Sequence, residues 1–188
     1  MSLAQVTITD ALRDAPALET VIDVRSPSEF AEDHLPGAVN WPVLDDAERA
    51  EVGTLYTQTS TFEARKRGAA LVSRNIAGLI EAHVAGRSRD WQPLVYCWRG
   101  GQRSGSLSLV LAQIGFRTRQ LQGGYKSFRA QVREDLATAP AQFGWRVLCG
   151  RTGSGKTRLL GALAEAGAQV LDLEGLAVHR GSVLGGLP

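Results

Sequence analysis

Short apolar strands alternate with helical segments through the first 137 residues, and this alternation restricts the possible folds more than any other feature. The predicted strands cover residues 6–8, 21–24, 94–96 and 119–121, with an edge strand after the turn at 34–40. The predicted helices cover residues 45–56, 62–84, 104–114 and about 125–136. Strands separated by helices form a mainly parallel sheet with helices on both faces. The sequence therefore predicts an α/β domain over residues 1–137.

Helix caps support two of the boundaries. Thr9 or Asp10 is expected to cap a small helix after the first strand. Ser26 is expected to be the N-cap of a second short helix, with Pro27 at its first position and Glu29 placed for a capping box.

Cys97 stands between a buried strand and a glycine-rich turn that leads into a helix. Backbone N–H groups of such a loop converge on one point, and the positive end of the helix lies behind them. This arrangement favours a thiolate and stabilises an anion bound against it. We expect Cys97 to be a nucleophile, or to carry sulfur or selenium; a small core cysteine at a strand end is the alternative. The predicted anion-binding loop consists of Arg99, Gly100, Gly101, Gln102, Arg103 and Ser104.

Two charged residues follow another predicted strand. Asp23 and Arg25 end the strand at 21–24, and in parallel sheets ligands bind beyond the carboxyl ends of the strands. We expect this pair to support the pocket that contains Cys97.

A second phosphate-binding motif follows a small, proline-containing linker at 138–144. Residues 150–157 fit the pattern G-x-x-x-x-G-K-[ST] between a predicted strand at 145–149 and a helix. The predicted phosphate ligands are Gly150, Gly153, Ser154, Gly155, Lys156 and Thr157, and Thr157 could also hold Mg²⁺. A further strand at 169–173 would place Asp172 and Glu174 near its end, as metal or base groups or as solvated acids. Two strands cannot cover their own sheet faces, so residues 145–188 read as an incomplete P-loop domain.

Charge is distributed unevenly along the chain. Residues 1–51 contain 11 acidic and 3 basic side chains, whereas the remainder contains 8 acidic and 18 basic ones. Such asymmetry suits a polyanionic partner, although solvated helix faces give the same pattern. The predicted phosphate contacts are Arg65, Lys66, Arg67 and Arg74.

Other features narrow the class of protein. No membrane span or export signal is expected, and two cysteines do not make a disulfide framework, so a reducing cytoplasm is the simplest location. The three histidines are far apart, which argues against a structural metal. Cys149, at the end of a predicted buried strand, is expected to react more slowly than Cys97. The sequence does not indicate an oligomeric state.

The first 137 residues resemble a rhodanese domain. The segments Asp23–Phe30, His34–Asn40 and Leu121–Tyr125 are similar to signatures of that family. Five residues separate Cys97 from Arg103, as in cysteine phosphatases, whereas sulfur-carrying single-domain rhodaneses usually have one fewer. The resemblance therefore implies a wider cradle that accommodates a tetrahedral phosphate, a thiophosphate or selenophosphate.

The whole chain resembles the tRNA 2-selenouridine synthase family. That family joins a Cys-Trp-Arg-Gly-Gly-x-Arg-Ser loop, as at 97–104, to a Walker A loop, as at 150–157, and residues 171–182 resemble its next segment. The resemblance implies that selenium from selenophosphate replaces sulfur in a wobble 2-thiouridine, through a geranylated intermediate made with geranyl diphosphate. The alternatives are a rhodanese-type sulfurtransferase acting on thiosulfate or a persulfide, a cysteine phosphatase with Asp23 or Glu29 as general acid, and a non-enzymatic tRNA-binding module.

Overall fold

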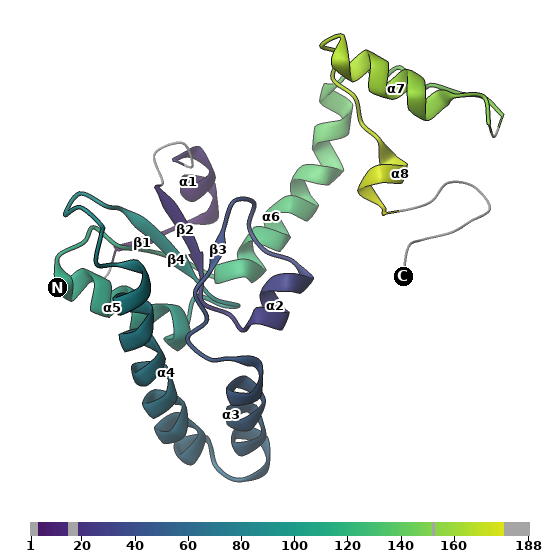
Figure 1. Cartoon of the computed structure of the whole chain (residues 1–188). Helices are drawn as coiled ribbons and strands as arrows, with labels where there is room; N and C mark the ends of the chain where they lie inside the picture. Colours follow the sequence, from purple (N-terminus) through teal and green to yellow (C-terminus); the bar gives the residue numbers. More distant parts are fainter. Residues whose placement is uncertain (1–3, 15–18, 152, 179–188) are drawn as a thin grey trace. The chain divides into compact units, whose positions relative to one another are not determined.

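The computed structural model describes residues 4–14, 19–151 and 153–178 (Figure 1). It divides into two compact units, Met1–Ala139 and Pro140–Pro188. The predicted linker at 138–144 includes the last residue of one helix and a short 3₁₀ helix, Ala139–Gln142. None of the helices in these described ranges is long and apolar enough to cross a membrane.

The first unit is built on a five-stranded sheet in which every neighbouring pair of strands is parallel. The strands are β1 (Ala4–Val6), β2 (Thr20–Asp23), β3 (Val39–Asn40), β4 (Pro93–Tyr96) and β5 (Arg119–Leu121). Their order in the sheet is β1-β5-β4-β2-β3, so β4 lies at the centre and β3 at an edge. The predicted rhodanese-like α/β fold with a parallel sheet is confirmed.

Helices connect the strands, as a parallel sheet requires. They are α1 (Ile8–Arg13), α2 (Pro27–Glu32), α3 (Asp46–Gln58), α4 (Thr61–His83), α5 (Gln102–Ile114) and α6 (Gly124–Thr138). Figure 1 shows α3 and α4 as an adjacent pair of long helices beside the sheet. At α2 the predicted cap is present: Pro27 begins the helix and the Glu29 carboxylate accepts the backbone N–H of Ser26 at 3.2 Å.

The prediction for the first strand and its helix cap was wrong by a few residues. The strand ends at Val6, where it pairs with Leu121 of β5, and Ile8 begins α1. Thr7 is the N-cap, because its hydroxyl accepts the backbone N–H of Asp10 at 3.1 Å, which neither Thr9 nor Asp10 itself can do from inside the helix.

Two apolar clusters cover opposite faces of the sheet. Along β4 the side chains alternate, so Leu94 and Tyr96 belong to the cluster with α1 and α6, while Val95 and Cys97 belong to the cluster with α4 and α5. Each fully buried aliphatic side chain contributes roughly 1.5–3 kcal/mol. Strand β4 is therefore buried on both faces and holds Cys97 at its carboxyl end.

Residues 153–178 of the second unit form the α-helices α7 (Lys156–Glu165) and α8 (Leu173–Leu176). The predicted strands at 145–149 and 169–173 are not formed, and Asp172 instead caps α8 by accepting the N–H of Gly175 at 3.0 Å. A strand needs a neighbour to accept its ladder hydrogen bonds, and residues 140–151 and 153–178 offer none. Within those same ranges no residue is buried, so these residues form no core of their own.

Candidate functional site

The carboxyl ends of β4 and β5 meet around Cys97. The backbone N–H of Tyr125, just after β5, donates to the Cys97 carbonyl at 2.9 Å, and the N–H of Lys126 donates to the Trp98 carbonyl at 3.0 Å. On the other side Asp23, the last residue of β2, is paired in register with Tyr96. The Cys97 loop is therefore attached to both neighbouring strands at the edge where parallel sheets bind ligands.

Two glycines allow the loop to lie this close to the start of α6. Gly124 has φ +59°, and a Cβ there would lie 2.6 Å from the backbone nitrogen of Gly100 and would collide with the carbonyl of Cys97. Gly100 has φ +66°, and its Cβ would lie 2.6 Å from the Leu121 carbonyl. This contact, which joins segments more than twenty residues apart, was not predicted from the sequence.

The Cys97 thiol is buried, with 4% of the residue exposed, and its Sγ lies 3.2 Å from the Ser104 hydroxyl. The Ser104 oxygen accepts a hydrogen bond from the Gln120 amide at 2.9 Å and lies 3.2 Å from the Gly101 carbonyl. A hydroxyl has one proton and can rotate it, so Ser104 can accept from a thiol or donate to a thiolate. Ser104, the last residue of the predicted anion-binding loop, therefore contacts the thiol directly.

Gln120 is a site residue that the sequence analysis missed. Its amide nitrogen donates to the Gly100 carbonyl at 2.8 Å as well as to Ser104, so it ties the loop to β5. The sequence did contain an indication of this role, because Gln120 is a polar residue inside the predicted strand 119–121. The structure shows that Gln120 is buried there.

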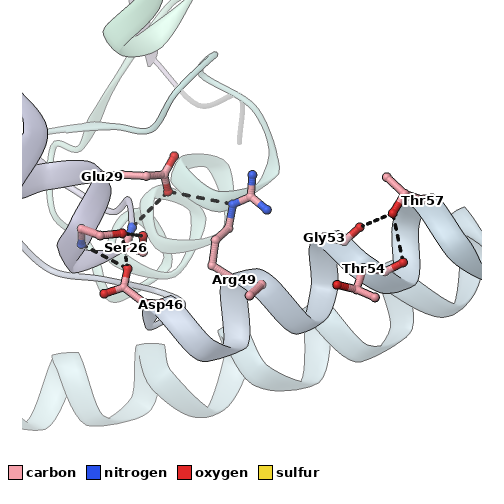
Figure 2. A pocket seen from close by; sticks show the side chains of 9 residues that line it. Ser26, Glu29, Asp46, Arg49, Gly53, Thr54 and Thr57 are labelled. Atoms are coloured by element: carbon pink, nitrogen blue, oxygen red, sulfur yellow. Dashed lines mark hydrogen bonds and ion pairs between the residues drawn. The ribbon is translucent and has the colours of Figure 1, made fainter.

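Arg103 is held by Glu29 of α2. The two guanidinium nitrogens Nη1 and Nη2 lie 2.6 and 3.3 Å from the carboxylate oxygens, and Arg49 approaches the same carboxylate at 3.9 Å (Figure 2). Burial by itself raises the pKa of Glu29, but the hydrogen bond and charge of Arg103 outweigh it and the net pKa is lowered. Glu29 is therefore ionised at neutral pH, which does not suit the general-acid role of the phosphatase hypothesis.

A hollow of about 430 Å³ lies beside this ion pair, where α2 faces α3. Its lining residues are Ser26, Ser28, Glu29, Asp46, Arg49, Ala50, Gly53, Thr54 and Thr57 (Figure 2).

Asp23 and Arg25 form a fully buried ion pair. Arg25 Nη2 lies 2.6 Å from Asp23 Oδ2, and the two residues are 1% and 0% exposed. Burial alone lowers the pKa of Arg25, but the hydrogen bond and charge of Asp23 reverse this and raise it. Both Asp23 oxygens accept hydrogen bonds from Arg25, so this carboxylate is fully engaged with the guanidinium.

A mostly apolar groove of about 740 Å³ adjoins the loop between α3, α4 and the start of α5. It shares Gln102 and Arg103 with the predicted anion-binding loop, and Arg65 lies in its wall. The remaining lining residues are Leu44, Val52, Tyr56, Ala64, Gly68, Ala69, Val72, Gly105, Ser106 and Leu109.

The described residues of the glycine-rich loop, 150, 151 and 153–157, include two glycines at positive φ. Gly153 and Gly155 both have φ +79°, and a Cβ on Gly150 would lie 2.7 Å from the Ser154 hydroxyl. Lys156 begins α7, and its ammonium donates to the carbonyls of Gly150 at 2.8 Å and Arg151 at 2.9 Å. Thr157 follows it in the first turn of α7 and is exposed.

Three of the four basic residues predicted to contact tRNA have carboxylate partners. Lys66 pairs with Glu63, Arg67 with Glu51 at 2.6 Å, and Arg74 with Glu48 at 2.7 Å. Their positive charge is therefore partly neutralised within the protein.

Cys149 is exposed, whereas a buried strand end was expected. The strand that would have buried it is not formed in the second unit. Iodoacetamide would therefore reach Cys149 easily, and a comparison of labelling rates requires a Cys149→Ser background.

No group of three or more His, Cys, Asp or Glu side chains that could hold a metal ion occurs in the part of the chain that the structure describes. Asp172 is engaged as the cap of α8, and Glu174 lies in the first turn of that helix.

Each of the two units matches the model of a known protein family. Residues 7–131 match the family model of the rhodanese-like domain, and residues 143–188 match that of the tRNA 2-selenouridine synthase AAA domain. The N-terminal domain of a Clostridium difficile 630 protein described as ATP/GTP-binding has a similar crystal structure, with a TM-score of 0.58 and 36% identity; the match covers 70% of this chain and 98% of that one.

The relatives matched over both units share one name. A tRNA 2-selenouridine synthase of Sulfurovum sp. (strain NBC37-1) is 45% identical over 88% of this chain and 44% of its own length. That of Aeromonas salmonicida (strain A449) is 40% identical over 89% of this chain and 44% of its own length. The chain thus spans less than half the length of these relatives. Its expected resemblance to the tRNA 2-selenouridine synthases is confirmed, and the chain belongs to the rhodanese-like domain family.

Proposed function

We propose that this chain is part of an enzyme that replaces the sulfur of a wobble 2-thiouridine in tRNA by selenium from selenophosphate, through a geranylated intermediate. The observation that carries the proposal is the Cys97 loop, which has five residues between Cys97 and Arg103 and is followed in the same chain by a Walker A loop. The relatives that combine both parts are named for this tRNA modification.

In the proposed reaction the geranyl group makes the sulfur a better leaving group. A bond forms between selenium and C2 of the uracil ring, the bond between C2 and sulfur breaks, and its electron pair leaves with geranyl thiolate. Hydrolysis of the selenium–phosphorus bond releases phosphate. Selenium remains on its phosphate donor until it attacks C2. Cys97 positions this donor, while Arg99, Arg103 and the loop amides hold its negative charge.

The mostly apolar groove supports the geranylated intermediate. It begins at Gln102 and Arg103, so a C₁₀ chain lying in it would extend directly from a base held at the loop. An apolar chain removed from water there gains roughly 25 cal/mol per Å² of buried surface.

The Walker A loop is proposed to bind the diphosphate of geranyl diphosphate or of a nucleotide. The Lys156 ammonium has three donors, and a bound phosphate can replace the loop carbonyls that it now contacts. The Thr157 hydroxyl, next to bound phosphate oxygens, has the oxygen chemistry that Mg²⁺ prefers. An enzyme acting on tRNA in this way would work in the cytoplasm.

A sulfurtransferase acting on thiosulfate or a persulfide is the second candidate, because the family match over residues 7–131 is to the rhodanese-like domain in general. In that reaction Cys97 would accept a sulfur atom and pass it to a nucleophile.

The test is mass spectrometry of wobble nucleosides from cells that lack the gene, complemented with wild type or with Cys97→Ser. We expect wild type to restore 2-selenouridine and Cys97→Ser to abolish it. Unchanged selenouridine and geranylthiouridine in all strains would refute the proposed reaction. Loss of thiosulfate:cyanide sulfurtransfer by Cys97→Ser, without any nucleoside change, would favour the second candidate.

A further inference from the structure

Trp98, which follows Cys97 directly, presents its indole to solvent. It is 41% exposed, whereas Trp41 and Trp91 of the same unit are buried in the core. Because so much of the indole is exposed, it contributes little to the core. It is therefore either an isolated surface residue or a contact for a ligand of the loop.

The indole is backed by a buried stack. Its ring centroid lies 5.3 Å from that of Tyr125, with the planes tilted by 36°. The Arg25 guanidinium lies 4.1 Å from the Tyr125 centroid and 6.0 Å from that of Trp98, and Asp23 fixes this guanidinium. The stack leaves part of the indole accessible while restricting its motion, so a ligand pays little entropy to contact it.

Two exposed basic residues adjoin Trp98 through the backbone. Arg99 follows it in sequence, and Lys126, whose N–H donates to the Trp98 carbonyl, lies on the neighbouring segment. Neither side chain forms an ion pair within residues 4–14, 19–151 and 153–178, in contrast to Lys66, Arg67 and Arg74. An accessible aromatic ring with exposed basic residues on adjoining segments is the combination that binds unpaired nucleotides, by stacking on the base and attraction to the phosphates.

We propose that Trp98 is the stacking platform for the nucleotide base that reacts at the Cys97 loop, with Arg99 and Lys126 contacting the adjoining phosphates. This inference rests on the proposed function in that it takes RNA as the substrate. The wobble base lies in an unpaired loop, so it can leave its neighbours and stack on the indole. Stacking also fixes the plane of the ring, which brings C2 to the mouth of the loop.

The experiment measures binding of an anticodon stem-loop RNA, with 2-thiouridine at the wobble position, to the 188-residue chain. We expect Trp98→Ala to weaken binding about 5- to 150-fold, the range for loss of one base–aromatic stack. Trp98→Phe keeps an aromatic face and should retain most of the affinity. Phe62→Ala is the matched control, because Phe62 is 65% exposed on α4 and away from the loop; it should change nothing.

A second measurement does not depend on how well Trp98→Ala folds. In Trp145→Phe the remaining exposed indole is Trp98, since Trp41 and Trp91 are buried. Saturation with the RNA should quench the Trp98 emission. Absence of quenching, unchanged affinity in Trp98→Ala, or no RNA binding at all would overturn the proposal. Self-association that is lost in Trp98→Ala, without RNA binding, would assign the indole to a protein interface instead.

The cellular assay separates this inference from the proposed function. If Cys97→Ser abolishes selenouridine but Trp98→Ala leaves both RNA binding and selenouridine unchanged, the platform is wrong and the function stands. If RNA binding requires Trp98 but loss of the gene leaves wobble nucleosides unchanged, the platform stands as an RNA contact and the reaction is wrong.

Discussion

The carboxylate of Glu29 holds the guanidinium of Arg103 across 74 residues of sequence, with its closest contact at 2.6 Å. Glu29 also accepts the N–H of Ser26, so one side chain closes the cap of α2 and orients the arginine at the start of α5. This orientation matters because Glu29 binds Nη1 and Nη2 of Arg103 from one side of the guanidinium. The remaining N–H groups of Arg103 point away from Glu29 and can bind an anion.

Glu29→Gln should therefore slow Cys97 chemistry without unfolding the protein. We expect a loss of about 1.5–3 kcal/mol of stability, the value of a hydrogen bond between charged groups, and slower alkylation of Cys97 in a Cys149→Ser background. Ala50→Gln, a change on the same hollow that leaves the ion pair intact, is the control. Equal alkylation rates in all three proteins would show that Glu29 does not affect the loop.

The contribution of Glu29 should depend on pH. The pKa of Glu29 is lowered in the folded protein, so its stabilisation is fully present above the ordinary value of 4.5 and is lost as pH falls through the lower folded value. Thermal unfolding of wild type and Glu29→Gln should show the largest difference near neutral pH and convergence in acid. A difference that grows on acidification would contradict the assignment.

Gly124→Ala adds only one methyl group, but it should disrupt the Cys97 loop. The new Cβ would stand 2.6 Å from the Gly100 nitrogen, at a positive φ that alanine rarely adopts. We expect destabilisation of about 1–3 kcal/mol, measured by urea unfolding, together with altered Cys97 alkylation. Gly78→Ala in α4, where a Cβ meets nothing within 4 Å, should be neutral or slightly stabilising.

Arg25→Met should be among the most destabilising single changes. It leaves the Asp23 carboxylate buried without its countercharge, which costs about 3–5 kcal/mol. Urea unfolding of Arg25→Met, Asp23→Asn and the double variant measures the coupling between the two residues. Additive single effects would show that the pair does not act as a unit.

The sequence predicted most of the first unit because each element carries a local signal. Strand β4 is a continuous apolar run, and Ser26, Pro27 and Glu29 form a local helix start, so both could be placed without knowing their neighbours. The contacts of Glu29 with Arg103 and of Gly124 with Gly100 depend on distant segments, and no local pattern contains them.

In the second unit, local sequence patterns predicted strands that are not formed. Residues 145–149 have the composition of a strand, but extended structure there requires a partner strand that the described residues do not provide. The left-handed glycines Gly153 and Gly155 and the start of α7 at Lys156 are nonetheless present, because both features are determined locally.

The role of the mostly apolar groove can be tested without changing a charged residue. Ala69 lies in its wall and is exposed, so Ala69→Phe should fill the groove without disturbing the core. We expect weaker binding of S-geranylated RNA and unchanged binding of the 2-thiouridine RNA. Ala70→Phe, the next exposed alanine of α4 outside the groove, is the control. Equal effects of both variants on both RNAs would exclude the groove as the geranyl site.

Salt dependence of tRNA binding distinguishes the two sets of basic residues. Each phosphate contact contributes about 0.7–0.9 to the slope of log affinity against log salt. Arg67 is already paired with Glu51, so Arg67→Ala should leave the slope nearly unchanged, whereas Arg99→Ala should reduce it by about that amount. The measurement is a set of titrations at increasing salt for wild type, Arg67→Ala, Arg74→Ala and Arg99→Ala. If the slope falls for Arg67→Ala and Arg74→Ala but not for Arg99→Ala, the RNA runs along α4, as the charge pattern of the sequence first suggested, and does not approach the indole of Trp98.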